Sequence, residues 1–242
     1  MKQTIFEITK NISLTDNVML MELKGDTSSI KCGQFVNILL DGLYLRRPIS
    51  VCDVNGDILT IIYKVVGKGT EKMALMKEGK LDVLTQLGNG YNLSLSGDKP
   101  LLIGGGVGVP PMYMLAKELR NQGKEVSVIL GFNTKSEIFY EEEFKKLGCA
   151  VCVCTGDGSY GVKGFVTDAM DIDYSYFYTC GPEPMLKAVY KASKTSGQFS
   201  FEERMGCGFG ACMGCSCETV TGYKRICKDG PVLEKEEILW KN

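Results

Sequence analysis

The stretch LLIGGGVGVPPM, residues 101–112, joins an apolar run to a glycine-rich turn and then to a pair of prolines. Such a run is typical of a buried strand, and proline is favoured in the first turn of a helix. Glycines at the switch let the backbone approach a diphosphate at a helix N-terminus, where free N–H groups favour negative charge. A tight turn that binds nothing would show the same pattern. The stretch therefore predicts the first strand and helix of an α/β domain, and a candidate nucleotide site.

The same alternation repeats three times further along the chain. Apolar runs at 125–132, 150–156 and 175–181 are each followed by a helical pattern, and the pattern after 150–156 covers residues 164–171. Four strand–helix repeats predict an open parallel sheet covered by helices. The last run continues into TCGPEPM, residues 179–185, which places Cys180 at the carboxyl edge of the sheet, where open α/β folds bind ligands.

Before residue 99 the pattern differs, because short β-rich runs are separated by Gly, Asn and Asp. This spacing predicts a small antiparallel barrel, interrupted by one helix over 70–79 with Thr70 as its N-cap. The predicted strands are 3–9, 17–23, 35–40, 49–54, 57–66 and 81–87. We therefore expect a barrel domain over 1–98, a nucleotide-binding α/β domain over 99–199, and a small C-terminal subdomain over 200–242 that is too short to form a core of its own.

Composition excludes several classes of function. The 242 residues carry a net charge of -1 and are 44% hydrophobic, without a basic stripe, so we expect no nucleic-acid partner. The N-terminus has no signal-peptide pattern, and no run approaches the roughly 18 apolar residues that span a membrane. We expect a cytoplasmic protein. Histidine is absent, which removes imidazole as a general base or metal ligand.

The second decisive stretch is CGFGACMGCSC, residues 207–217, which holds four of the chain's 11 cysteines. The spacing Cys207-x4-Cys212-x2-Cys215, followed by Cys227, matches the ligand pattern of plant-type [2Fe-2S] ferredoxins. Nearby glycines favour this interpretation, since backbone must pack tightly on an inorganic core. A structural zinc site is the alternative, although it usually pairs its cysteines as C-x2–4-C. Cys217 is interpreted as an unliganded thiol.

Two short motifs of the barrel region contain groups that bind phosphate. LRRPISV, residues 45–51, carries Arg46 and Arg47 on a predicted strand, and VVGKGTEKM, residues 65–73, places Gly67, Gly69 and Thr70 at a helix start. An arginine fork and a Gly-Thr helix start can bind one diphosphate together. GKGT lacks the upstream glycine of a Walker A motif, so ATP is not implied.

These motifs, in this order, resemble the ferredoxin–NADP reductase superfamily. With the terminal cysteine pattern and the segments RRPIS, LGNGY, EERMGCGFGACMGC and CKDGPV, the whole chain resembles the electron-transfer subunits of the NAD-dependent type B dihydroorotate dehydrogenases of pyrimidine synthesis. The resemblance implies three cofactors, FAD, NAD(H) and a [2Fe-2S] cluster, and no catalytic acid or base in this chain.

The resemblance also assigns residues to each cofactor. FAD is assigned to Arg47, Pro48, Ile49, Ser50, Tyr63, Lys64, Val65, Gly69 and Thr70. NAD(H) is assigned to Gly104, Gly105, Gly106, Val107, Gly108, Pro110, Pro111, Cys180, Gly181 and Pro182. The cluster is assigned to Cys207, Cys212, Cys215 and Cys227. From the residues alone the choice between NAD and NADP stays open, because Lys135 and Glu137 both follow the second strand of the α/β domain.

The family further implies a partner subunit that carries FMN and the dihydroorotate site, with two copies of each subunit in a heterotetramer. Electrons from dihydroorotate oxidation would then pass through this chain to NAD+. Two alternatives remain at this stage. One is a reductase subunit of a related hydrogenase, sulfide or bifurcating NAD(P)H–ferredoxin complex, and the other is a zinc-stabilised module without enzymatic activity.

Overall fold

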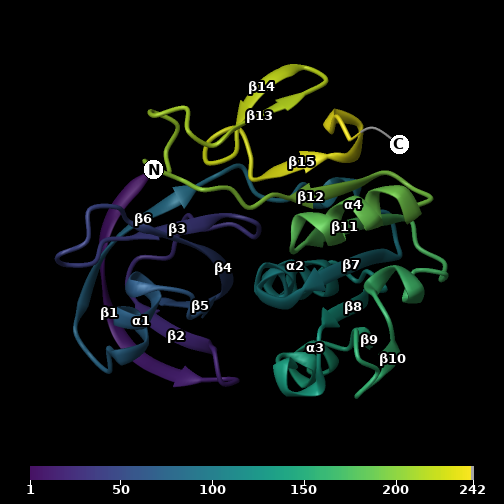
Figure 1. Cartoon of the computed structure of the whole chain (residues 1–242), viewed down its shortest axis with the longest axis horizontal. Helices are drawn as coiled ribbons and strands as arrows, with labels where there is room; N and C mark the ends of the chain where they lie inside the picture. Colours follow the sequence, from purple (N-terminus) through teal and green to yellow (C-terminus); the bar gives the residue numbers. More distant parts are fainter. Residues whose placement is uncertain (241–242) are drawn as a thin grey trace.

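The structure is a computed structural model and describes residues 1–240, so the last two residues of the predicted subdomain lie outside the described part. Its N-terminal half is a closed antiparallel barrel of six strands in the order β1-β2-β5-β4-β3-β6, seen at the left of Figure 1. This confirms the predicted barrel. The strands are β1 (Lys2–Ser13), β2 (Val18–Lys24), β3 (Phe35–Ile38), β4 (Arg47–Asn55), β5 (Ile58–Lys64) and β6 (Lys80–Leu87).

The barrel helix α1 (Lys68–Leu75) begins earlier than its sequence predicts. Its N-cap is Gly67, and Thr70 stands three residues inside the helix. The Thr70 hydroxyl accepts hydrogen bonds from the backbone N–H groups of Val66 at 2.9 Å and Gly67 at 3.3 Å. The prediction of Thr70 as N-cap is therefore wrong, because its side chain satisfies N–H groups that precede the helix rather than those of the first turn.

The second domain is a seven-stranded sheet in the order β10-β9-β8-β7-β11-β12-β15, which confirms the α/β architecture. All neighbours are parallel except β12 and β15. The strands are β7 (Pro100–Gly105), β8 (Ser127–Phe132), β9 (Ala150–Thr155), β10 (Val162–Lys163), β11 (Tyr176–Cys180), β12 (Gly197–Ser200) and β15 (Val232–Glu234). The helices are α2 (Pro110–Asn121), α3 (Glu141–Lys146) and α4 (Glu183–Ala192).

One of the four expected helices is not a helix. Residues 164–171 form only the short 3₁₀ turn η4 (Val166–Ala169), where the carboxylate of Asp168 accepts a hydrogen bond from the Phe165 N–H at 2.8 Å. A local bond of this kind, next to the β-branched Val166 and Thr167, competes with helix formation. The other 3₁₀ turns are η1 (Leu93–Leu95), η2 (Gly106–Gly108), η3 (Lys135–Glu137) and η5 (Lys235–Glu237).

The C-terminal segment lies across the top of both domains in Figure 1. It forms the hairpin β13 (Ser216–Thr219) and β14 (Gly222–Arg225) and then returns as β15 to the edge of the parallel sheet. Its buried residues share one hydrophobic cluster with the barrel and with the sheet, so this segment has no separate core. Members of that cluster include Phe35, Leu84, Leu101, Ile103, Cys215, Ile226 and Cys227.

Helix α2 packs against β4 and joins the two domains. Lys117 of α2 forms an ion pair with Asp53 of β4 and donates a hydrogen bond to the Val54 carbonyl at 2.9 Å. No helix within residues 1–240 combines the length and the apolar character needed to cross a membrane.

Candidate cofactor and cluster sites

Arg47 meets the start of helix α1 on the outside of the barrel. A Cβ atom built on Gly69 would lie 2.0 Å from the Arg47 Nε, so a side chain at position 69 would displace the Arg47 guanidinium from its present place. Nη1 of Arg47 donates to the carbonyl of Leu45. Arg47, Pro48, Ile49 and Ser50 are all half-buried along β4. The structure thus brings the predicted arginine and the predicted Gly-Thr helix start together.

The neighbouring Arg46 has a different environment. Its Nη1 donates to the Asp82 carboxylate at 2.9 Å, to the Asp82 carbonyl at 3.1 Å and to the Asn37 carbonyl at 3.3 Å. Desolvation raises the pKa of Asp82, but the bonds from Arg46 and Gln3 outweigh it and lower that pKa. Arg46 therefore braces strands β3 and β6, whereas Arg47 forms no ion pair with any other residue of the described range 1–240 and is available to an anion.

The end of strand β5 lies beside the same region. Tyr63 is buried, its hydroxyl donates to the Asn11 side chain at 3.2 Å, and desolvation raises its pKa to about 12. Lys64 is exposed, and it lines the cavity described next. Val65, which completes the predicted trio, is half-buried.

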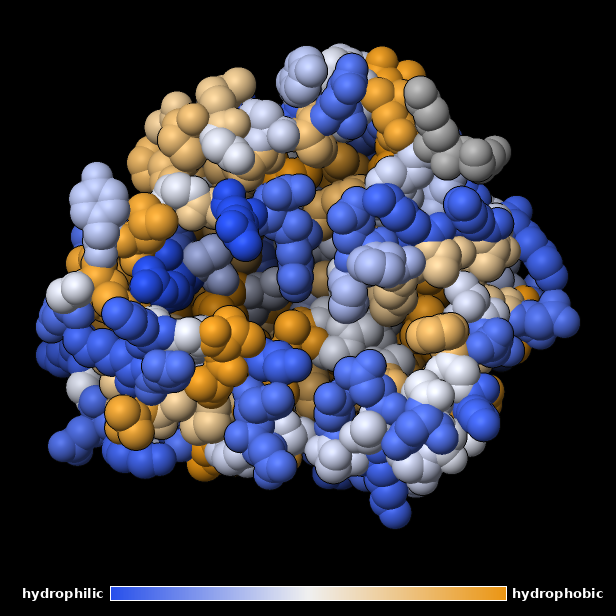
Figure 2. Space-filling model, viewed as in Figure 1, coloured by the Kyte–Doolittle hydropathy of each residue, from blue (hydrophilic) through white to orange (hydrophobic). Residues whose placement is uncertain are grey.

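A cavity of about 560 Å³ runs along the carboxyl ends of β7, β8, β9 and β11 and reaches the barrel at Lys64. Figure 2 shows the corresponding hollow near the centre of this face, between the two domains. Six of the ten residues predicted to hold NAD(H) line it, and these are Gly105, Gly106, Val107, Gly108, Gly181 and Pro182.

The other four predicted residues lie beneath the cavity. Gly104, Pro110, Pro111 and Cys180 are buried and are not among its lining residues. Cys180 ends β11, and a Cβ on Gly108 would lie 2.2 Å from its carbonyl oxygen. Burial raises the pKa of the Cys180 thiol far above its ordinary value. These residues form the tight turn under the cavity rather than its wall.

Sequence reasoning missed several lining residues. Phe165, Met185 and Glu202 all line the cavity, and desolvation raises the pKa of Glu202. They come from loops and a helix whose positions follow from the fold, so no local motif marks them. Glu137 also lines the cavity, whereas the Lys135 amine lies 5.8 Å from the ring centre of Tyr160 and is not part of the wall.

The four cysteines of the C-terminal pattern are linked two by two through backbone amides. The N–H of Cys212 donates to the Cys207 Sγ, and the N–H of Cys227 donates to the Cys215 Sγ. Within residues 1–240, no three carboxylate or thiol groups converge as ligands of a single ion. Cys217 lies on β13 and belongs to neither pair; desolvation raises its pKa.

Backbone N–H groups surround the Cys207 sulfur. The amides of Ala211 and Cys212 donate to its Sγ at 3.2 and 3.4 Å, and the amide of Cys227 donates to the Cys215 Sγ at 3.4 Å. Desolvation raises the pKa of Cys207, but the amides of Phe209, Cys212 and Ala211 and the Cys212 thiol lower it to about 6. A loop that turns its amides toward a thiolate fits a metal–sulfur ligand set.

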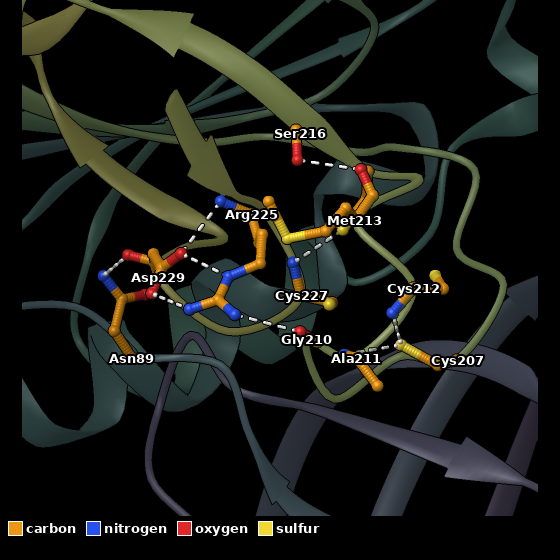
Figure 3. Close-up of polar contacts among 11 residues, drawn as sticks. Asn89, Cys207, Gly210, Ala211, Cys212, Met213, Ser216, Arg225, Cys227 and Asp229 are labelled. Atoms are coloured by element: carbon orange, nitrogen blue, oxygen red, sulfur yellow. Dashed lines mark hydrogen bonds and ion pairs between the residues drawn. The ribbon is translucent and has the colours of Figure 1, made fainter. Parts of the chain in front are cut away.

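The loop is held in place from the side of β14, as Figure 3 shows. Nη1 of Arg225 donates to the Gly210 carbonyl at 2.9 Å, while Arg225 Nε is 2.9 Å from the Asp229 carboxylate. Asn89, which follows strand β6 of the barrel, reaches the same place, because its Nδ2 donates to the Asp229 carbonyl at 3.4 Å. Its side chain also donates to the Val232 carbonyl at 2.7 Å and accepts from the Val232 N–H at 3.1 Å. The cysteine loop is therefore fixed to the barrel.

Comparison with known proteins agrees with this arrangement. Residues 202–239 match the family model described as the iron-sulfur cluster binding domain of dihydroorotate dehydrogenase B. Residues 102–191 match the oxidoreductase NAD-binding domain. The first match decides between the two interpretations of the cysteines in favour of an iron–sulfur cluster.

The similarity extends over the whole chain. The chain is 45% identical to the dihydroorotate dehydrogenase B (NAD(+)) electron transfer subunit of Fusobacterium nucleatum subsp. nucleatum, over 96% of each chain. It is 42% identical to the subunit of that name from Bacillus pumilus, over 98% of each.

Among solved structures, an NADH-dependent reduced ferredoxin–NADP oxidoreductase, described for flavin-based electron bifurcation, superposes with a TM-score of 0.88 and 30% identity. The match covers 97% of this chain and 90% of that one. Two fused cofactor domains and end-to-end identity at this level lead to one conclusion: the chain belongs to the family of electron transfer subunits of NAD(+)-dependent dihydroorotate dehydrogenase B.

Proposed function

We propose that this electron transfer subunit holds its redox groups, FAD, NAD(H) and a [2Fe-2S] cluster, on three separate sets of residues. The observation that carries the proposal is the position of the cysteine loop. Its cysteines are linked two by two through backbone N–H···S bonds, and the loop contacts the same barrel that places Arg47 beside Gly69. When bound, the flavin exchanges two electrons with a nicotinamide and single electrons with an iron–sulfur cluster.

In the proposed flavin site, Arg47 pairs with the diphosphate through its guanidinium, and the first turn of α1 presents the N–H groups of Gly69 and Thr70 to the same group. The strand backbone from Pro48 to Ser50 and from Tyr63 to Val65 supports the ring system. The absence of a Cβ at Gly69, which the present place of the Arg47 guanidinium requires, supports this assignment.

In the proposed nicotinamide site, the dinucleotide lies in the 560 Å³ cavity with its diphosphate over Gly105 to Gly108, before helix α2. Lys64 of the barrel lines this cavity together with Gly181, Glu202, Glu137 and Phe165 of the α/β domain and the segment after it. Gly104, Cys180, Pro110 and Pro111 lie under the cavity and shape its floor without touching the ligand. The reach of the cavity from the barrel to β9 supports a ligand as long as a dinucleotide.

In the proposed cluster site, Cys207 and Cys212 bind one iron, and Cys215 and Cys227 bind the other. The N–H···S bonds that link Cys212 to Cys207 and Cys227 to Cys215 support this division. The backbone N–H groups around Cys207 stabilise its thiolate, and Arg225 holds the loop through the Gly210 carbonyl.

We further propose that the partner is the FMN-containing catalytic subunit, with two copies of each subunit, and that electrons from dihydroorotate pass through the cluster and the flavin to NAD+. Phe209 and Met213 of the cysteine loop are 42% and 54% exposed, and Figure 2 shows a broad apolar area at the upper left, where Figure 1 places this loop. An exposed apolar rim beside the cluster supports docking there. Eleven free thiols support a reducing, cytoplasmic location.

A reductase subunit of a bifurcating complex is the second candidate, because the solved structure at 30% identity is of that kind. The higher identity of 45% to a dihydroorotate dehydrogenase subunit favours the first candidate. The two differ in the partner, so the partner provides the test.

The experiment is purification without oxygen, with and without co-expressed catalytic subunit. We expect flavin absorbance, about two irons and two sulfides per chain, and NAD+ reduction by dihydroorotate only in the complex. Zinc in place of iron would contradict the proposed cluster. A complex that carries flavin and iron but does not oxidise dihydroorotate would contradict the proposed partner.

A further inference from the structure

Asn37 of strand β3 contacts the cysteine loop from the barrel. Its neighbours Val36 and Ile38 belong to the barrel's hydrophobic core, so by strand alternation Asn37 faces the opposite side. The residue is 1% exposed. Its Nδ2 donates a hydrogen bond to the carbonyl of Cys207 at 3.2 Å. A buried amide of the flavin domain is thus bonded directly to the backbone of a cluster ligand.

The loop closes tightly on this amide. A Cβ built on Gly208 would lie 2.3 Å from the Asn37 Nδ2, and Gly208 has a φ of +77°, which a residue with a side chain rarely adopts. Glycine at 208 therefore allows the loop backbone to rest on Asn37. The contact depends on both residues.

The backbone of Asn37 is fixed relative to the proposed flavin site. It pairs with Pro48 in the β3–β4 ladder, and its carbonyl accepts a hydrogen bond from Arg46 at 3.3 Å. Arg46 is in turn paired with Asp82 on β6. Asn37 thus connects the strand that carries Arg47 to the loop that carries Cys207.

The Oδ1 atom of Asn37 is evidence that position 37 needs an amide for its contact with the loop. This Oδ1 is buried and accepts no hydrogen bond from any residue in the part of the chain that the structure describes. An apolar side chain of the same shape would avoid this unpaired acceptor, which is unfavourable in a protein interior. The bond that Nδ2 makes to Cys207 is the interaction that such a side chain would lose.

We propose that Asn37 is a positioning residue for electron transfer between the flavin and the cluster. By binding the Cys207 carbonyl, it holds the cluster loop at a fixed place on the β3–β4 strand pair. The inference rests on the proposed residue sets for FAD and the cluster. Outer-shell partners of metal ligands commonly change affinity or activity by about 10- to 100-fold when they are removed, and small misplacements of reacting groups have effects of similar size.

The test uses the complete chain with both cofactors and the variant Asn37→Leu, which keeps the shape of the side chain and removes the donor. NADH is mixed with the oxidised protein, and flavin bleaching and the cluster's electron paramagnetic resonance signal are followed separately in time. We expect flavin reduction at the wild-type rate and reduction of the cluster slowed by about tenfold, with FAD and iron contents unchanged.

Thr27→Val is the matched control. Thr27 is also buried, and its hydroxyl donates to a backbone carbonyl, but the recipient is Gly56 in the turn between β4 and β5, at 2.6 Å. We expect both reduction rates to stay at their wild-type values in this variant. If Thr27→Val slowed cluster reduction as much as Asn37→Leu, a general loosening of the barrel would explain the effect and the inference would fail.

Gly208→Ala disturbs the same contact from the side of the loop. It provides a second test of the role of Asn37 if Asn37→Leu does not fold. We expect it to slow cluster reduction similarly, and to increase hydrogen exchange of residues 206–211 in protein freed of iron. Wild-type cluster reduction in the folded variants would overturn the role of Asn37. Wild-type protein without flavin or without two irons would instead overturn the proposed function itself.

Discussion

The side chain of Arg47 lies across Gly69, with its Nε 2.0 Å from the position where a Cβ would stand. One residue belongs to strand β4 and the other to the first turn of α1, so this contact brings a cationic fork and a helix N-terminus to one place. Arg46 next to it is already paired with Asp82, which leaves Arg47 as the available partner for a diphosphate.

Gly69→Ala is expected to weaken FAD binding by tenfold or more, because the new methyl group must displace the Arg47 guanidinium; tenfold corresponds to about 1.4 kcal/mol. Gly67→Ala is the matched control, since a Cβ there meets no atom within 4 Å and its φ of 173° is ordinary extended backbone. Titration of the deflavinated proteins with FAD, followed by fluorescence, measures both. Equal affinities would remove Arg47 and Gly69 from the flavin site.

Cys212→Ser is expected to lose the cluster while NADH still reduces the flavin, because the cysteine lies on the loop and not in the nicotinamide cavity. Cys217→Ser is expected to keep both irons, since Cys217 belongs to neither pair of linked cysteines. Iron analysis and the rate of flavin bleaching by NADH check the two variants. Iron loss in Cys217→Ser would show that the ligand set is wrong.

Glu137→Gln is expected to narrow the preference for NADH over NADPH by about three- to tenfold, because a carboxylate in the cavity wall repels a 2′-phosphate. Lys135→Gln should leave this preference unchanged, since the Lys135 amine lies near the ring of Tyr160 instead. The ratio of kcat/KM for the two nucleotides in flavin reduction is the measurement. If Lys135→Gln changed this preference more than Glu137→Gln, the adenosine ribose would lie beside Lys135 and not beside Glu137.

Asp82→Asn is expected to destabilise the flavin-loaded protein by about 0.5–1 kcal/mol at neutral pH, as for a partly exposed ion pair. The folded-state pKa of Asp82 lies below its ordinary value of 3.8, so its stabilising effect is present above that value and is lost as the pH falls through the folded pKa. Urea unfolding between pH 3 and 7 should therefore show a weaker acid dependence in the variant.

Asp98→Asn serves as the control, because the Asp98 side chain is 96% exposed in its pair with Lys124. Its unfolding midpoint should follow that of the wild type across the same pH range. An Asp82→Asn protein that matched the wild type at neutral pH would mean that Arg46 does not brace the barrel.

Much of this fold is readable from local patterns. Alternating apolar residues mark the barrel strands, and the glycine turn after Ile103 marks the start of the α/β domain. The cysteine spacing predicts a set of cluster ligands, and the loop between Cys207 and Cys215 turns its own amides toward sulfur, as such a set requires. These features depend on neighbours in sequence.

The features that escaped prediction depend on neighbours in space. Strand β15 has only three residues and is defined by its pairing with β12. The turn η4 forms in place of the predicted helix because the Asp168 carboxylate accepts a hydrogen bond from the Phe165 N–H. Glu202 and Phe165 reach the nicotinamide cavity only through the folding of distant segments. Asn37 carries no motif, and its bond to Cys207 spans 170 positions.

The return of the C-terminal segment to Asn89 and to β12 has a consequence for biogenesis. On the ribosome the barrel and most of the parallel sheet emerge before Val232, which bonds to Asn89 and pairs with β12. The segment that carries the cysteine loop can therefore take its final place only after both domains have been made. Insertion of the cluster would then follow the folding of these domains, and a chain truncated before this segment would expose β12 as an unpaired strand edge.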